Sequence, residues 1–201
     1  MNNIETLCLM IEKYCENNIE DLTKEQEIVS KIYVIMKNWC SNKTPGQHNN
    51  NFNCESYNIF FKNFIHLLLK FRNSEDVEKQ KFAKNFLFSS TDVPIYRFLN
   101  LKFDAKTKTL KEDIVYDNNF CSWTLCERSN YLESKMSKGT VRVTAYLNIN
   151  EYGIKVEKMG FSQQFEKEVI FSFRKENISK IEIIVYKDSG DVFEVIDKSR
   201  I

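Results

Sequence analysis

The sequence has few of the residues that build irregular loops or bind metals. Its 201 residues include 5 glycines and 2 prolines, which argues against a small, loop-rich fold. The only histidines are His48 and His66, and no two of the 6 cysteines are separated by two residues. A structural zinc site needs clustered ligands at short spacing, so none is expected. The scattered cysteines fit free thiols better than disulfides.

Strong net charge and long apolar runs are also missing. A net charge of +1 implies no particular attraction to nucleic acid or to membranes. The longest apolar run, residues 64–69, is far too short to cross a bilayer. The N-terminus lacks the basic and apolar segments of a secretory signal peptide. We therefore expect a cytoplasmic protein, or an effector that reaches the cytosol of a host or target cell by another export route.

What the sequence does contain is an ordinary globular composition, with 42% apolar and 28% charged residues. Over the first 90 residues, apolar positions recur at three- and four-residue steps and predict four helices. We expect the first at 4–19, the second after a capping pair of Thr23 and Gln26, and the third at about 55–72. Ser74 is expected to cap the fourth. His66, among leucines and phenylalanines, is expected in the core.

After residue 90 the pattern changes to short stretches with strand propensity. Strands are expected at 93–99, 120–125, 140–149, 154–156, 166–173, 181–186 and 192–196, with a turn or hairpin at 104–113. Residues 140–149 alternate between apolar and polar side chains, which predicts a half-buried strand. Helices followed by mostly antiparallel strands predict the α+β class.

Three polar motifs lie on these expected strands. Arg97 is in the first, Ser122 and Thr124 are in the next, and Glu166 and Glu168 precede an apolar run. Alternate residues of a strand project from one face, so the two glutamates are expected to point together. Two acids on one face can perform acid–base and charge-stabilising chemistry.

Each motif alone also fits an ordinary structural role. Arg97 could pair with a neighbouring acid on a strand surface, and Ser122 and Thr124 could be ordinary strand hydroxyls. Trp123, between those two residues, fits the core or an interface better than a ligand platform. The paired glutamates could form a solvated strand edge.

In this order and at this spacing, the motifs resemble those of the mono-ADP-ribosyltransferases of the Arg-Ser-Glu class, which includes clostridial-type toxins and vertebrate ecto-transferases. The resemblance covers about residues 93–185. The sequence departs from the family pattern at Trp123, where the middle residue is usually small, and at Phe98, where many members have glycine. The resemblance implies one domain over residues 1–201, with a helical layer at 1–90 packed on a two-sheet, NAD-binding β core at 91–201.

The resemblance further implies an enzyme that moves ADP-ribose from NAD to a protein side chain, with arginine as the expected acceptor and with release of nicotinamide. Glu168 would stabilise the positive charge that develops on the ribose. Ser122 would hold Glu168 by a hydrogen bond, and Glu166 would be the base for the acceptor. Arg97 would bind the diphosphate through its two-nitrogen fork.

The residues implied to bind NAD are Arg97, Phe98, Ser122, Thr124 and Glu168. The loop before the two glutamates, with Phe161, Gln164 and Phe165, would contact the target protein. NAD is expected as the substrate, no metal is required, and the chain is expected to be a monomer that binds neither nucleic acid nor membranes.

Two alternatives stay open at this point. The first is an NAD glycohydrolase on the same scaffold, which would hydrolyse NAD without a protein acceptor. The second is a non-catalytic protein-interaction module, in which the motif match has no chemical meaning; Trp123 is the feature that most favours it.

Overall fold

The computed structural model belongs to the α+β class, as the order of the sequence patterns predicts. It describes residues 3–16, 21–41, 54–90, 94–100, 103–104, 109–110, 120–127, 140–148, 150–160, 167–172, 174–186 and 192–197. The chain divides into two compact units. The helical unit comprises residues 1–88 and 152–163, and the sheet unit comprises residues 89–151 and 164–201.

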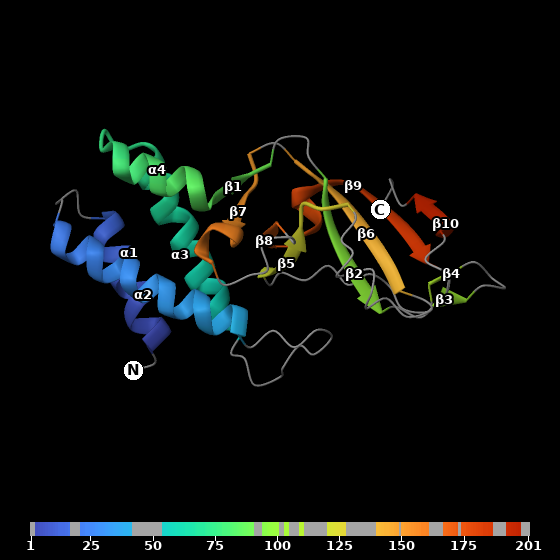
Figure 1. Ribbon diagram of the computed structural model, residues 1–201, viewed down its shortest axis with the longest axis horizontal. Coiled ribbons are helices and arrows are strands. Elements are labelled where there is room, and N and C mark those ends of the chain that lie inside the picture. The colour runs from blue at the N-terminus through green and yellow to red at the C-terminus, as the bar shows by residue number, and fades with distance from the viewer. Residues whose placement is uncertain are drawn as a thin grey trace. The chain divides into compact units, whose positions relative to one another are not determined.

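The α-helices described in the helical unit are α1 (Asn3–Glu16), α2 (Leu22–Ser41), α3 (Cys54–Arg72) and α4 (Val77–Phe86). Helix α3 is central, because it packs against α1, α4 and the strand β7 (Tyr152–Lys155) (Figure 1). Strand β7 is the neighbour of β1 (Leu87–Ser89). The fully buried side chains of the helices include Leu7, Ile11, Ile32, Met36, Phe60, Phe61, Phe64 and Leu68. Burying each such side chain stabilises the fold by roughly 1.5–3 kcal/mol.

Two details of the helix prediction are wrong. The helix α2 begins one residue before Thr23, and the carboxylate of Asp21 accepts hydrogen bonds from the backbone N–H groups of Thr23 and Lys24. Helix α4 is capped by Asp76, whose side chain accepts from two backbone N–H groups of the first turn, and not by Ser74. In both cases an aspartate immediately before the helix supplies the oxygen that the free N–H groups need.

The expectation for His66 is also wrong, because its side chain is exposed. The buried positions of α3 near it are Phe64, Leu67 and Leu68. At 100° per residue, position 66 lies on the other side of the helix from this stripe.

A buried polar cluster joins three helices of this unit. The Tyr14 hydroxyl on α1 donates to Glu25 Oε1 on α2, and Lys79 Nζ on α4 lies 2.8 Å from the same oxygen. All three residues are less than 9% exposed. The carboxylate therefore has a hydroxyl donor and an ammonium partner, which offset the cost of removing it from water.

Six of the strands described in the sheet unit lie in the spatial order β8-β5-β2-β6-β9-β10 (Figure 1). Their bounds are β2 (Ile95–Asn100), β5 (Phe120–Thr124), β6 (Thr140–Leu147), β8 (Glu168–Ser172), β9 (Ile178–Tyr186) and β10 (Val192–Asp197). Every neighbouring pair among the six is antiparallel. Each of these strands coincides with one that the sequence predicts, to within a few residues.

A short antiparallel ladder of β3 (Phe103–Asp104) and β4 (Thr109–Leu110) lies where the sequence predicts a turn or hairpin. The β core of two sheets that the family resemblance implies is not confirmed, because the described strands of the sheet unit form one main sheet and this ladder.

Of the helices described, none combines the length and the apolarity needed to span a membrane. The cysteines whose side chains are described are thiols and not disulfides, as the sequence predicts; they are Cys8, Cys15, Cys40, Cys121 and Cys126.

Candidate functional site

The strand register divides the side chains of the sheet between two faces. Directly paired residues of neighbouring strands project from the same side. Such pairs join one row across β8, β5, β2, β6 and β9, formed by Glu168, Thr124, Tyr96, Thr144 and Glu182. We call the side that bears this row the polar face, and the opposite side the apolar face.

Several polar residues of the polar face are buried. Glu168 is 4% exposed, Thr124 5%, Thr144 2% and Arg142, two residues before Thr144 on β6, 6%. Burying polar groups costs free energy unless they gain hydrogen-bond or charge partners. The polar side chains of a solvated strand face are exposed and not buried. We therefore take the polar face as the candidate functional site.

Ser122 and Glu168 meet on the polar face. Ser122 is two residues before Thr124 on β5, and its Oγ lies 2.5 Å from Glu168 Oε1 on the neighbouring strand β8. A hydroxyl can donate to a carboxylate oxygen, so this contact fixes the orientation of the Glu168 side chain. It is the contact that the family resemblance implies for these two residues.

Thr124 is directly opposite Glu168 and holds the end of β5. Its Oγ1 accepts a hydrogen bond of 3.0 Å from the backbone N–H of Cys126. The backbone N–H of Leu125 in turn donates to the carbonyl of Lys167, immediately before β8. The backbone of Lys167 has a φ of +41°, in the left-handed region that residues other than glycine rarely adopt. The strand therefore begins only at Glu168, and the period-two argument that paired Glu166 with Glu168 does not extend across Lys167.

Arg97 does not join Ser122 and Glu168. It follows Tyr96 on β2, so its side chain is on the apolar face. There its Nη1 lies 3.0 Å from Cys121 Sγ, and its guanidinium lies 5.9 Å from the centre of the Trp123 ring. The three residues Arg97, Ser122 and Glu168, which the family resemblance places at one site, are therefore on two faces of the sheet.

The same alternation explains why Trp123 is tolerated between Ser122 and Thr124. Its ring is on the apolar face, where it is 2% exposed and its Nε1–H donates to Cys121 Sγ at 3.2 Å. The bulky ring therefore takes no space on the side where Ser122 contacts Glu168. Phe98, the other departure from the family pattern, is half-buried on the polar face, two residues after Tyr96.

Arg142, like Thr144, is a residue of this face that the sequence did not single out. It is directly opposite Phe98, and its guanidinium lies 5.3 Å from the centre of the Tyr96 ring. Its Nη1 donates to the carbonyl of Glu127 at 3.0 Å, and its Nη2 lies 3.3 Å from Glu127 Oε1. The available signal was a cation in the polar phase of an alternating strand, and that pattern usually marks a solvated surface.

Three further polar side chains of this face form a second cluster across β6 and β9. Lys180 Nζ and the Tyr146 hydroxyl both contact the carboxylate of Glu182, at 2.5 and 3.3 Å. Burial and then the charge of Glu182 raise the pKa of Tyr146. Burial and then the charge of Glu127 raise the pKa of Tyr96, and Arg142 opposes this shift. Glu127 and Glu182 thus raise the pKa of the tyrosines near them, and each is paired with a cation.

Four predicted site residues, Glu166, Phe161, Gln164 and Phe165, lie outside the described residues. Within the described part of the chain, no three His, Cys, Asp or Glu side chains are grouped so that they could hold a metal ion.

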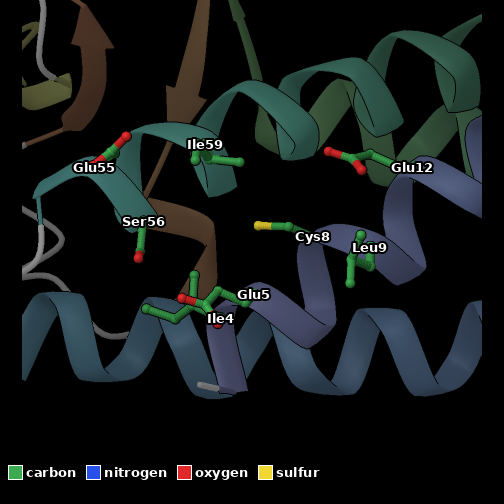
Figure 2. Close-up of a pocket in the computed structure, with 8 residues that line it drawn as sticks. All are labelled: Ile4, Glu5, Cys8, Leu9, Glu12, Glu55, Ser56 and Ile59. Atoms are coloured by element: carbon green, nitrogen blue, oxygen red, sulfur yellow. The ribbon is translucent and has the colours of Figure 1, made fainter. Parts of the chain in front are cut away.

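The helical unit has a hollow of its own, between α1 and α3 (Figure 2). Its volume is about 390 Å³, and Glu5, Glu12 and Glu55 line it together with apolar side chains and Cys8. Burial raises the pKa of the Cys8 thiol to about 11, and the carboxylate of Glu12 adds to this. No lysine or arginine is among its lining residues, so this hollow does not suit a diphosphate.

A comparison of the chain with models of protein families, with curated proteins and with solved structures finds no match.

Proposed function

We propose that the chain is an NAD-dependent mono-ADP-ribosyltransferase, with Glu168 as its catalytic carboxylate. The observation that carries this proposal is the hydrogen bond between Ser122 and Glu168 on a buried polar face. The two residues are far apart in the sequence and were expected together only because of the family resemblance.

The geometry suits cleavage of the bond between nicotinamide and ribose. As this bond breaks, its electron pair leaves with the nicotinamide nitrogen, and the ribose carbon becomes positively charged. A carboxylate that is already oriented by Ser122 can stabilise this charge without reorganising. The side chain of the acceptor then attacks the same carbon and loses its proton to a base, a role that we assign to Glu166. Phe161, Gln164 and Phe165 would contact the acceptor protein, with arginine as the modified residue.

The test is an assay of nicotinamide release and of label transfer from NAD to the proteins of a cell lysate. Glu168→Gln keeps the size of the side chain but removes its charge, and is expected to lower both activities by about 100- to 1,000-fold. Glu176→Gln is the matched control, since Glu176 is an exposed glutamate of the same unit. No activity in the wild-type protein, or full activity in Glu168→Gln, would refute the proposal.

The same assay separates the transferase from an NAD glycohydrolase. The Ser122–Glu168 pair addresses bond cleavage, which both enzymes share. Nicotinamide release that is unchanged when every protein acceptor is omitted, with no label on protein, would identify the glycohydrolase.

One observation favours a non-catalytic module as the second candidate function. Arg97 is on the apolar face, so the predicted set of three residues is not assembled on one side of the sheet. A domain of this kind would bind a partner without cleaving NAD. NAD would then leave the melting temperature unchanged, whereas a bound substrate at saturating concentration raises it.

A further inference from the structure

Two buried polar atoms of the polar face have no hydrogen-bond partner among the described residues. They are Nε of Arg142 and Oγ1 of Thr144, on residues that are 6% and 2% exposed. Buried polar groups are nearly always paired, so two such atoms on one face require an explanation. The two residues are alternate positions of β6 and therefore project from the same side.

The guanidinium of Arg142 extends from β6 towards the strands that bear Thr124 and Glu168. It lies over the ring of Tyr96 on β2 and reaches Glu127, three residues beyond Thr124 at the end of β5. Strands β6 and β8 are three positions apart in the sheet, which is roughly 14 Å between backbones. A long side chain that leans across β2 covers a large part of this distance.

Another anion can replace the side chain of Glu127 in its ion pair with Arg142. The Glu127 side chain is 62% exposed, whereas that of Arg142 is 7% exposed. An ion pair with such an exposed partner contributes little stability, and the released carboxylate is solvated at once. Of the other acids of this face, Glu182 is paired with Lys180, and Glu168 is hydrogen-bonded by Ser122.

We propose that Arg142 and Thr144 bind the diphosphate of a nucleotide of the NAD class, and that the diphosphate displaces the carboxylate of Glu127. Nε and an Nη of the guanidinium can donate two parallel hydrogen bonds to two phosphate oxygens. The Thr144 hydroxyl donates a further hydrogen bond to the diphosphate. The role that the family pattern implies for Arg97 is then performed by an arginine of another strand. This inference rests on the proposed function for the nature of the ligand.

The experiment measures binding by calorimetry with three probes: ADP-ribose, inorganic pyrophosphate and adenosine. The wild-type protein is expected to bind the first two, and Arg142→Gln to bind them about 10- to 100-fold more weakly. Thr144→Val, which changes shape very little, should weaken binding several-fold. Arg97→Gln tests the competing assignment of the diphosphate to Arg97. Arg174→Gln is the control, since Arg174 belongs to the same unit but lies outside its strands.

Glu127→Gln keeps the test decisive even if Arg142→Gln does not fold. It removes an exposed competitor of the ligand, so ADP-ribose should bind several-fold more tightly, an effect that a purely structural role of the Arg142–Glu127 pair does not produce. Undiminished binding by a folded Arg142→Gln, a loss in Arg97→Gln alone, or Glu127→Gln and Thr144→Val both indistinguishable from wild type would overturn the proposal.

A wild-type protein that binds none of the three probes would overturn it as well. Diphosphate binding without nicotinamide release would instead refute the proposed enzyme and leave this site standing.

Discussion

The two faces of the six neighbouring strands of the sheet unit bury side chains of different kinds. On the apolar face, Trp123, Val143, Val169 and Phe171 are at most 2% exposed, and their burial stabilises the fold directly. On the polar face, Thr124, Arg142, Thr144 and Glu168 are almost as well buried, although such residues lose hydration when they leave water. Stability alone explains the first face. For the second, we propose that a ligand or a reaction is the reason.

The largest difference between the faces is expected in the loss of unfolding free energy when two neighbouring residues of β8 are replaced by alanine. Phe171 is 1% exposed on the apolar face, and Ser172 is 6% exposed on the polar face. Phe171→Ala removes a large buried ring and should lower the free energy of unfolding by about 3–5 kcal/mol. Ser172→Ala should lower it by about 1 kcal/mol. Denaturation by urea measures both, and similar losses would mean that the two faces do not differ as described.

A second prediction concerns the buried polar cluster of the helical unit, where Glu25 has both Tyr14 and Lys79 as partners. Lys79→Met leaves the carboxylate of Glu25 buried without its cation, and should lower the free energy of unfolding by about 3 kcal/mol. Lys81→Met on the same helix is the control, since the Lys81 side chain is 66% exposed, and should change it by less than about 0.5 kcal/mol. An equally small effect of Lys79→Met would contradict a stabilising role of this buried ion pair.

These contrasts also show which features could be read from the sequence. Periodicity located the helices and strands, because burial of one side imposes spacings of 3.6 and 2 residues. The hydrogen bond of Ser122 with Glu168 was expected because the family pattern implies a contact between these two residues, which their spacing in the sequence does not predict. The caps were assigned to the wrong residues because Thr23 and Ser74 are also good capping residues, and only the position at which each helix begins decides between them.

The side on which Arg97 lies could not be derived in the same way. Alternation places Tyr96 and Arg97 on opposite faces, but the pairing of Tyr96 with Thr124 decides which of them shares the side of Ser122. This pairing depends on contacts between residues distant in the chain. Arg142 was missed for a related reason: residues 140–149 predict a half-buried strand, and burial of both of its faces is a property of the folded sheet.

A third prediction uses Tyr96 to report the charges of the polar face. Burial, and next the carboxylate of Glu127, raise the pKa of Tyr96 above its ordinary 10.0, so the folded protein favours the neutral phenol. The resulting stability is fully present below pH 10 and is lost as the pH rises through the folded pKa. Absorbance at 295 nm, compared with Tyr96→Phe, isolates this titration. Glu127→Gln should move it back towards 10; titration of Tyr96 at or below 10 would contradict the described surroundings.

The smallest expected effect concerns two threonines of the same row. The hydroxyl of Thr124 accepts a hydrogen bond from the backbone of Cys126, whereas that of Thr144 has no such partner among the described residues. Thr124→Val should therefore lower the free energy of unfolding by about 1 kcal/mol. Thr144→Val should leave it unchanged or raise it by up to about 1 kcal/mol, because an unpaired buried hydroxyl is replaced by a methyl group.

Urea denaturation without ligand compares the two variants directly. If Thr144→Val is as destabilising as Thr124→Val, the Thr144 hydroxyl has a partner within the protein, and one of the two observations behind the diphosphate site is removed. If Thr144→Val is stabilising and ADP-ribose binding is weakened in the same variant, the protein retains this hydroxyl at a cost in stability for the sake of its ligand.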